Sequence, residues 1–156
     1  MPEIVTAQVE SFTACFDEWS TLIDGHYDEL SLHKAQGIPL RPQWHEYFRR
    51  DAIGSVLYVT LRKRGKMIGY LIGFIAPSLH YETCLTCMPD IFYIHPDHRG
   101  GVNALRLFRA AERELKRRGV RAWFMGSKNH KDSSRLFRAL GFEAVETVHC
   151  KWLGDR

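Results

Sequence analysis

The sequence predicts a single α/β domain over residues 1–156, in which helices flank a mixed, mostly antiparallel central sheet. The chain has 156 residues, of which 45% are hydrophobic, and this is enough for one core. Two apolar, β-branched runs within residues 56–75 are separated by a basic turn, which is typical of a hairpin. After residue 80, strand patterns alternate with helix patterns, as expected of a mixed α/β sheet.

The first third is expected to contain one strand and two helices. Ser11 precedes apolar residues that recur at helical spacing, so it is predicted to be the N-cap of a helix that stops at Gly25. Pro42 can begin a second helix, because its fixed backbone angle suits the first turn. The predicted elements are a strand at 3–7, a helix from 12 to Gly25, a loop at 30–40 and a helix at 42–51.

The middle of the chain reads as three strands. Residues 56–61 and 67–75 form the predicted hairpin around the basic turn, and residues 83–94 form the next strand. Pro89 lies inside that third strand and has no N–H to donate to a neighbour. We therefore expect a bulge or broken pairing at Pro89.

The last third is expected to contain two helices and two strands. An apolar stripe predicts a helix that ends at Gly119, and Asp132 or Ser133 can cap a short helix that ends at Gly141. The stripe consists of Leu105, Phe108, Ala111 and Leu115. The predicted strands lie at 122–126 and 143–152.

Composition narrows the class of protein. The net charge of +4 suits an anionic cofactor as well as nucleic acid. The basic groups at 62–64 and 117–118 have no aromatic platform between them, so nucleic acid is not the expected partner. The sequence has no run of about 18 apolar residues and no leader pattern at its start, so we expect no membrane contact and a cytoplasmic location.

The four cysteines are interpreted as structural. Cys84 and Cys87 have the spacing of a metal or redox pair, but no second pair accompanies them, and they begin a probable strand rather than a helix. No histidine pair has the HExxH spacing either. We therefore expect no metal.

The most informative stretch is 90–105, where an apolar strand runs through a glycine-rich turn directly into a helix. This geometry gathers free backbone N–H groups and the positive end of a helix, which suits a phosphate or pyrophosphate. Arg99 adds a charge at the mouth. No lysine followed by Ser or Thr comes after Gly101, which excludes a Walker loop, and two adjacent glycines do not make a dinucleotide fingerprint.

This turn resembles the acyl-CoA loop of the GNAT N-acetyltransferases. Arg99 and Ala104 fit that loop, whereas Val102 stands where the family has glycine, and Gly100 and Gly101 lie one step earlier. Two flanking segments are also similar: Ile94-His-Pro96, and a second motif that runs from Asn129 to Gly141-Phe142. The resemblance covers roughly residues 55–152, and residues 88–142 read much like the small acetyltransferase-like proteins of tailed phages.

The resemblance implies a GNAT fold with splayed fourth and fifth strands, acetyl-CoA as acyl donor, and direct transfer to an amine. The gap between those strands would hold the acyl chain. Backbone N–H groups near Tyr93–His95 would bind the oxyanion. The implied cofactor-binding residues are Ile94, His95, Arg99, Gly100, Gly101, Val102, Asn103, Ala104, Lys128, Asn129 and Phe137.

The implied catalytic residues are Asp90, Tyr93 and Ser133. Asp90 occupies the position of the family's strand glutamate, and burial of its neighbours would raise its pKa toward that of a useful base. A structural aspartate that stabilises a bulge is the alternative. The family's usual acid, a tyrosine, falls on Phe137, which has no proton to give, so Tyr93, Ser133, Ser134 or solvent would replace it.

Two His-Tyr pairs are candidates for binding the acceptor. His26, Tyr27 and Glu29 follow the first helix, and His80 and Tyr81 follow the hairpin, in loops that flank the acceptor side of the GNAT fold. A histidine there can itself act as base, or these residues are ordinary surface residues. Residues 44–50 either shape an acceptor groove or simply pack. The acceptor stays open between a small amine, a peptide terminus and a protein lysine.

Val102 and Phe137 support a second interpretation, a GNAT scaffold that binds acyl-CoA or a protein partner without turnover. A homodimer is compatible with either interpretation.

Overall fold

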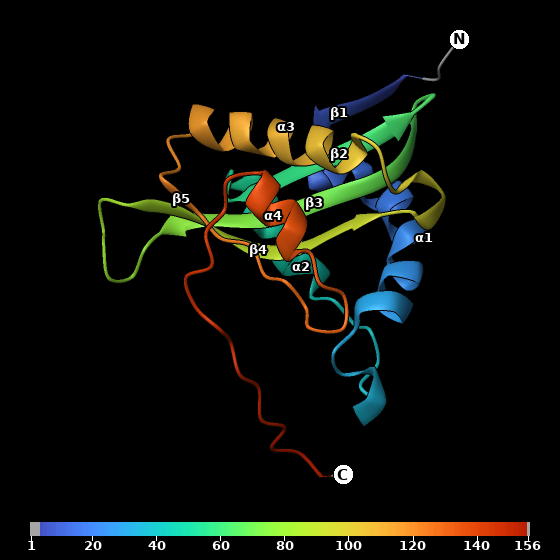
Figure 1. Cartoon of the computed structure of the whole chain (residues 1–156), viewed down its shortest axis with the longest axis vertical. Coiled ribbons are helices and arrows are strands. Elements are labelled where there is room, and N and C mark those ends of the chain that lie inside the picture. The colour runs from blue at the N-terminus through green and yellow to red at the C-terminus, as the bar shows by residue number, and fades with distance from the viewer. Residues whose placement is uncertain (1–3, 156) are drawn as a thin grey trace.

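The computed structural model describes residues 4–155, which form a five-stranded sheet with helices on both faces (Figure 1). The strand order is β1-β2-β3-β4-β5, with antiparallel pairing throughout except between β4 and β5, which are parallel. The predicted mixed, mostly antiparallel sheet is therefore confirmed. The strands are β1 (Val5–Val9), β2 (Val56–Lys63), β3 (Lys66–Pro77), β4 (Leu85–Ile94) and β5 (Ala122–Trp123). Glu3, at the start of the first predicted strand, lies outside the described residues.

Helices α1 (Phe12–Leu30) and α2 (Trp44–Ala52) cover one face of the sheet. Ser11 is the N-cap of α1, as predicted, and its side chain accepts a hydrogen bond from the N–H of Ala14. The predicted stop at Gly25 is wrong, because the helix continues to Leu30. A Cβ at Gly25 would lie 3.3 Å from the Tyr93 hydroxyl, so this glycine allows α1 to pass close to β4.

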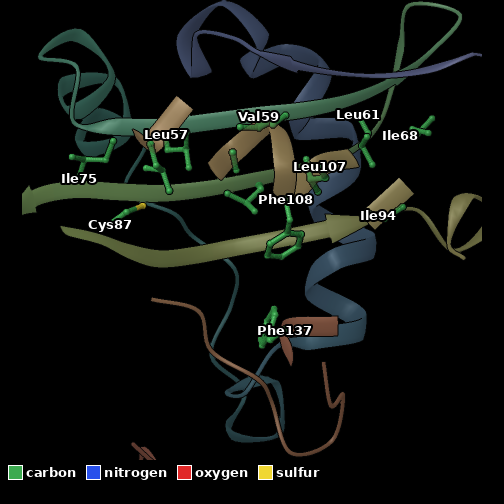
Figure 2. Close-up of a cluster of buried hydrophobic side chains, with 14 residues drawn as sticks. Leu57, Val59, Leu61, Ile68, Ile75, Cys87, Ile94, Leu107, Phe108 and Phe137 are labelled. Carbon is green, nitrogen blue, oxygen red and sulfur yellow. The ribbon is translucent and has the colours of Figure 1, made fainter. Parts of the chain in front are cut away.

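Helices α3 (Asn103–Arg117) and α4 (Ser134–Ala139) pack on the other face. Figure 2 shows Leu107 and Phe108 of α3 against the β2 side chains Leu57 and Val59, all of them fully or almost fully buried. Phe137 of α4 completes this core and is 7% exposed. Burying large apolar side chains in this way is the main stabilising contribution to the fold.

The bulge predicted at Pro89 is present in β4. Ile72 of β3 pairs with Ile91, whereas the next residue, Gly73, pairs with Pro89. Asp90 is thus the extra residue of the bulge, with no partner on β3.

Strands β4 and β5 separate almost at once. They pair only at Thr86 with Ala122 and at Cys87 with Trp123. Beyond Cys87 the two segments diverge, which confirms the predicted splaying of the fourth and fifth strands. The predicted strand at 122–126 is accordingly reduced to two residues.

The predicted strand at 143–152 is wrong. This segment pairs with no strand of the described chain and leads away from the sheet (Figure 1). Val145 and Val148 are 71% and 84% exposed. The segment has β-branched residues, but strand formation depends on packing and pairing as well as on composition.

Candidate functional site

A cavity of about 390 Å³ opens where β4 and β5 separate, a volume within the usual range for small-molecule sites. One wall is residues 89–94 of β4, and the facing wall is residues 125–128 after β5. The end of α1 contributes His26 and Glu29, and the turn before α3 contributes Arg99 and Gly100. The loss of strand pairing beyond Cys87 therefore creates the site.

Asp90 lines this cavity from the bulge. Its Oδ2 accepts a hydrogen bond from the Tyr47 hydroxyl at 2.7 Å. Burial raises the pKa of Asp90, while the hydrogen bond from Tyr47 and the charge of Arg50 oppose part of the rise. The result is a carboxylate held in one orientation and with enhanced basicity, as a general base needs.

The turn before α3 has the backbone predicted for an anion site. Gly100 and Gly101 have φ angles of +91° and +55°, which only glycine adopts easily. Val102 is the N-cap of α3 and makes no side-chain cap hydrogen bond, so no capping side chain competes for the N–H groups of the first turn. Val102 is half exposed and does not line the cavity, so its side chain leaves the cavity open.

The family model described as the acetyltransferase (GNAT) family matches residues 16–142. The chain belongs to the GNAT family. Solved structures support the same fold. A ribosomal-protein-alanine N-acetyltransferase from Brucella melitensis biovar Abortus 2308 superposes with a TM-score of 0.72 at 16% identity, covering 97% of this chain and 100% of that one.

Two further structures have the same fold. An aminoglycoside acetyltransferase from an uncultured soil metagenomic sample, in complex with sisomicin, gives a TM-score of 0.71 at 13% identity over 97% of both chains. A predicted acetyltransferase with acetyl-CoA from Clostridium acetobutylicum gives 0.67 at 14% identity, covering 98% of this chain and 96% of that one. No curated protein matches the chain.

A cluster of charges links α1 of this GNAT domain to the turn before α3. Arg99 Nη1 is 2.6 Å from Glu29 Oε1, and Arg99 Nε donates to the carbonyl of Ile94 at 2.7 Å. Lys131 also bridges to Glu29, at 2.7 Å. The hydrogen bond with Arg99, supported by Lys131, lowers the pKa of Glu29 to about 2. Glu29 therefore holds Arg99 at the mouth of the cavity. The sequence predicts Arg99 at this place but does not predict its pairing with Glu29.

His26 and Lys128 add two partly desolvated groups to the cavity. His26 is 5% exposed, and its ring stacks on Tyr93. Burial lowers its pKa to about 4, and the positive charges of Lys128 and Arg99 contribute to the fall while Glu29 opposes it. Burial also lowers the pKa of Lys128 and raises the pKa of Tyr93. His26 is thus uncharged at neutral pH.

Ten of the predicted site residues line the cavity, and they come from five segments of the chain. They are His26, Glu29, Asp90, Tyr93, Ile94, Arg99, Gly100, Ala104, Lys128 and Ser133.

Three of the predicted acceptor-binding residues do not line the cavity. The segment at 26–29 is helical rather than a loop, so Tyr27 faces away from its neighbours in the cavity and its hydroxyl donates to the carbonyl of Ile38 at 2.7 Å. His80 and Tyr81 lie in the exposed turn between β3 and β4 and do not line the cavity. Only one of the two His-Tyr pairs therefore reaches the site, and only through its histidine.

Other predicted cofactor residues lie beside the cavity rather than in its wall. Gly101, Val102 and Asn103 form the turn into α3, and Asn129 is exposed next to Lys128. The side chain of His95 makes a local hydrogen bond, in which its Nδ1 accepts from the N–H of Asp97. Phe137 lies in the core among the rings of Phe92, Phe108 and Phe142.

Sequence reasoning missed the partners that position the site. From the sequence, Tyr47 is only a groove or packing residue, and neither Tyr70 nor Lys131 has an assigned role. All three act through contacts between distant parts of the chain, such as Tyr47 with Asp90, 43 positions away. Pro42 predicts the helix that carries Tyr47, but no spacing in the sequence connects Tyr47 to Asp90.

Within residues 4–155, no three His, Cys, Asp or Glu side chains come together as a metal site. None of the helices described there has the length and apolar character needed to cross a bilayer.

Proposed function

We propose that this GNAT protein transfers an acetyl group from acetyl-CoA directly to an amine acceptor. The observation that carries the proposal is the parting of β4 and β5 beyond Cys87, which leaves one cavity bordered by both Asp90 and the turn before α3. A base and an anion-binding turn on one cavity are what acyl transfer from a charged donor requires.

The turn before α3 fits a diphosphate group. A Cβ at Gly100 or Gly101 would meet open space, so the backbone there is accessible to a ligand. The uncapped first turn of α3 offers N–H groups, and Arg99, Lys128 and Lys131 bring positive charge to the adjoining cavity. We expect the N–H of Ile94 to bind the donor further along β4, whereas the N–H of His95 donates to the carbonyl of Ile68 at 2.8 Å and is not available to a ligand.

Asp90 is the proposed general base. The acceptor amine enters as an ammonium ion, and Asp90 takes one of its protons so that the nitrogen lone pair becomes free. The nitrogen then attacks the thioester carbon, the C–N bond forms, and the C–S bond breaks with its electrons remaining on sulfur, while the nitrogen releases its second proton to solvent. Ser133 and Tyr93 line the cavity and are the proposed proton donors to that thiolate.

The names of solved structures with this fold support an amine acceptor. They include a ribosomal-protein-alanine N-acetyltransferase and an aminoglycoside acetyltransferase bound to sisomicin. Both kinds of acceptor carry amines, but they differ in size. We therefore propose the amine and leave small molecule, peptide terminus and protein lysine as the classes to be compared.

Phe137 favours one alternative, a scaffold that binds acyl-CoA or a protein partner without turnover. This side chain has no hydroxyl and is packed in the core, so it provides no acid. The alternative predicts acetyl-CoA binding without product.

The test is release of CoA thiol from acetyl-CoA with three amine classes: a polyamine, a peptide with a free N-terminus and a lysine-containing peptide. Products are checked by mass. Asp90→Asn is compared with Asp97→Asn, whose carboxylate is 81% exposed in the turn after β4. We expect one class to be acetylated by the wild type and by Asp97→Asn, with a loss of about 100-fold or more in Asp90→Asn. Equal turnover by Asp90→Asn would exclude it as base.

A further inference from the structure

The ring of His26 is held rigidly at the inner wall of the cavity. Gly25, which precedes it in α1, allows the helix to approach the Tyr93 hydroxyl, and this places His26 against β3 and β4. The imidazole stacks on the Tyr93 ring, with centroids 5.1 Å apart and planes inclined by 14°. His26 Nδ1 lies 2.6 Å from the hydroxyl of Tyr70. Two aromatic neighbours thus determine the orientation of the ring.

The contact with Tyr70 determines which nitrogen carries the proton. Tyr70 is fully buried, and within residues 4–155 the hydrogen-bond partner of its hydroxyl is His26. A buried hydroxyl that donates to nothing loses a hydrogen bond that water would otherwise provide. The Tyr70 O–H therefore donates to Nδ1, and in a neutral ring the proton resides on Nε2.

Nε2 is the atom of His26 that can meet a ligand. His26 lines the cavity, and Nε2 is not one of the fully buried polar atoms without a partner. Three charged side chains act on this ring. Lys128 and Arg99, from other segments, oppose its protonation, and Glu29 of the same helix favours it. Glu29 is already bound by Arg99 and Lys131. Nε2–H is consequently a neutral donor awaiting an acceptor atom.

Among the groups that react in this cavity, the thioester carbonyl oxygen is the acceptor that matches. The amine enters as a donor of hydrogen bonds and must keep its lone pair for attack. The carbonyl oxygen accepts hydrogen bonds and gains negative charge as the amine adds to the carbon. Fixed donors aimed at such an oxygen are a major source of catalysis.

Resting on the proposed function, we propose that His26 Nε2–H donates a hydrogen bond to the carbonyl oxygen of the acyl thioester. When the amine attacks, the π electrons of the C=O bond move to the oxygen beside Nε2–H. They return as the C–S bond breaks, and the thiolate takes its proton elsewhere. His26 keeps its proton throughout, so it is an oxyanion donor rather than the base that its residue type suggested.

The test compares acetyl-CoA with S-ethyl-CoA, which has CH₂ in place of the carbonyl group, by calorimetric titration of the full chain. Removing the donor in His26→Phe should reduce the preference for acetyl-CoA by about three- to tenfold. Affinity for S-ethyl-CoA serves as the internal control for lost packing. The matched control is His45→Phe, because His45 is exposed on α2, and it should keep the wild-type preference.

A nitrogen-15 NMR spectrum of the unliganded wild type provides a second readout. It should show protonated Nε2 and unprotonated Nδ1 for His26, and Tyr70→Phe should disturb that assignment. An unchanged preference in His26→Phe, or a proton on Nδ1, would overturn this inference while leaving the proposed function standing. Failure of the wild type to bind either CoA derivative would overturn both.

Discussion

The hydroxyl of Tyr47 donates a hydrogen bond to Oδ2 of Asp90, and this contact joins α2 to the bulge in β4. Asp90 is the residue that the bulge leaves without a partner on β3, so its carboxylate depends on α2 for its orientation. Burial destabilises the charged form of Asp90, and the bond from Tyr47 favours it. The basicity of Asp90 is thus set by two elements far apart in the sequence.

Tyr47→Phe should raise the pKa of Asp90 further, because it removes a hydrogen bond to the charged carboxylate. The acid limb of the rate against pH should therefore move to higher pH, with the plateau rate changed less than the limb. Tyr27→Phe is the matched control, since the Tyr27 hydroxyl bonds to a backbone carbonyl instead. A profile that does not move in Tyr47→Phe would contradict Asp90 as the base.

His26 should make the folded chain less stable in acid. Its pKa is about 4 in the folded chain against 6.5 as the ordinary value, so the unfolded chain binds the proton first as pH falls. The contribution of neutral His26 is complete above pH 6.5 and declines toward pH 4, by about 3 kcal/mol at most. Urea unfolding of the wild type and of His26→Gln at pH 7.5 and 4.5 measures this contribution. If both proteins lost the same free energy of unfolding between the two pH values, the result would be evidence against a neutral, buried ring.

Glu29→Gln should strengthen the binding of acetyl-CoA several-fold. The carboxylate of Glu29 neutralises Arg99 and Lys131, so its removal leaves the cavity more positive for an anionic donor. Titrations at low and high salt should show the gain shrinking as salt screens the charges. Glu46→Gln removes a similar ion-paired carboxylate on α2 and should have no effect. Weaker binding in Glu29→Gln would mean that Glu29 positions Arg99 for the ligand.

Phe137→Tyr should destabilise the chain instead of restoring an acid. The resemblance implies an acid at this position, but the ring is 7% exposed and packed among three other phenylalanines. Burying an unpartnered hydroxyl costs about 1–3 kcal/mol. Thermal melts of Phe137→Tyr check this, with Phe16→Tyr as the control because Phe16 is partly exposed. A Phe137→Tyr variant that is as stable as the wild type and more active would show that this position belongs to the active site.

The sheet, the bulge and the glycine turn before α3 could all be predicted, because each depends on local signals. A proline inside a strand has no N–H to donate, so Pro89 interrupts the pairing of β4. The adjacent glycines of the turn before α3 adopt positive φ angles, which glycine tolerates. The predictions failed where packing decides the outcome. Gly25 resembles a helix stop, yet the close approach of Tyr93 makes it an interior residue of α1. The segment at 143–152 resembles a strand but finds no partner.

Several candidate residues from the sequence line the cavity, but the contacts that hold them in place do not follow from the sequence. Asp90, His26 and Arg99 were candidates by residue type and position. Their states depend on Tyr47, Tyr70 and Glu29, which no spacing rule connects to them. The resemblance to phage acetyltransferase-like proteins, a cytoplasmic location and a homodimer stay predictions.

The most direct measurement is a calorimetric titration and thermal melt with acetyl-CoA, using wild type, Gly100→Val and the control Gly119→Val. Both glycines have positive φ and open space around them, but only Gly100 lies on the cavity. Acetyl-CoA at about a hundred times its Kd should stabilise the wild type and Gly119→Val by about 2.7 kcal/mol, and Gly100→Val much less. Absence of binding to the wild type, or full affinity in Gly100→Val, would contradict the assignment of this turn to the donor.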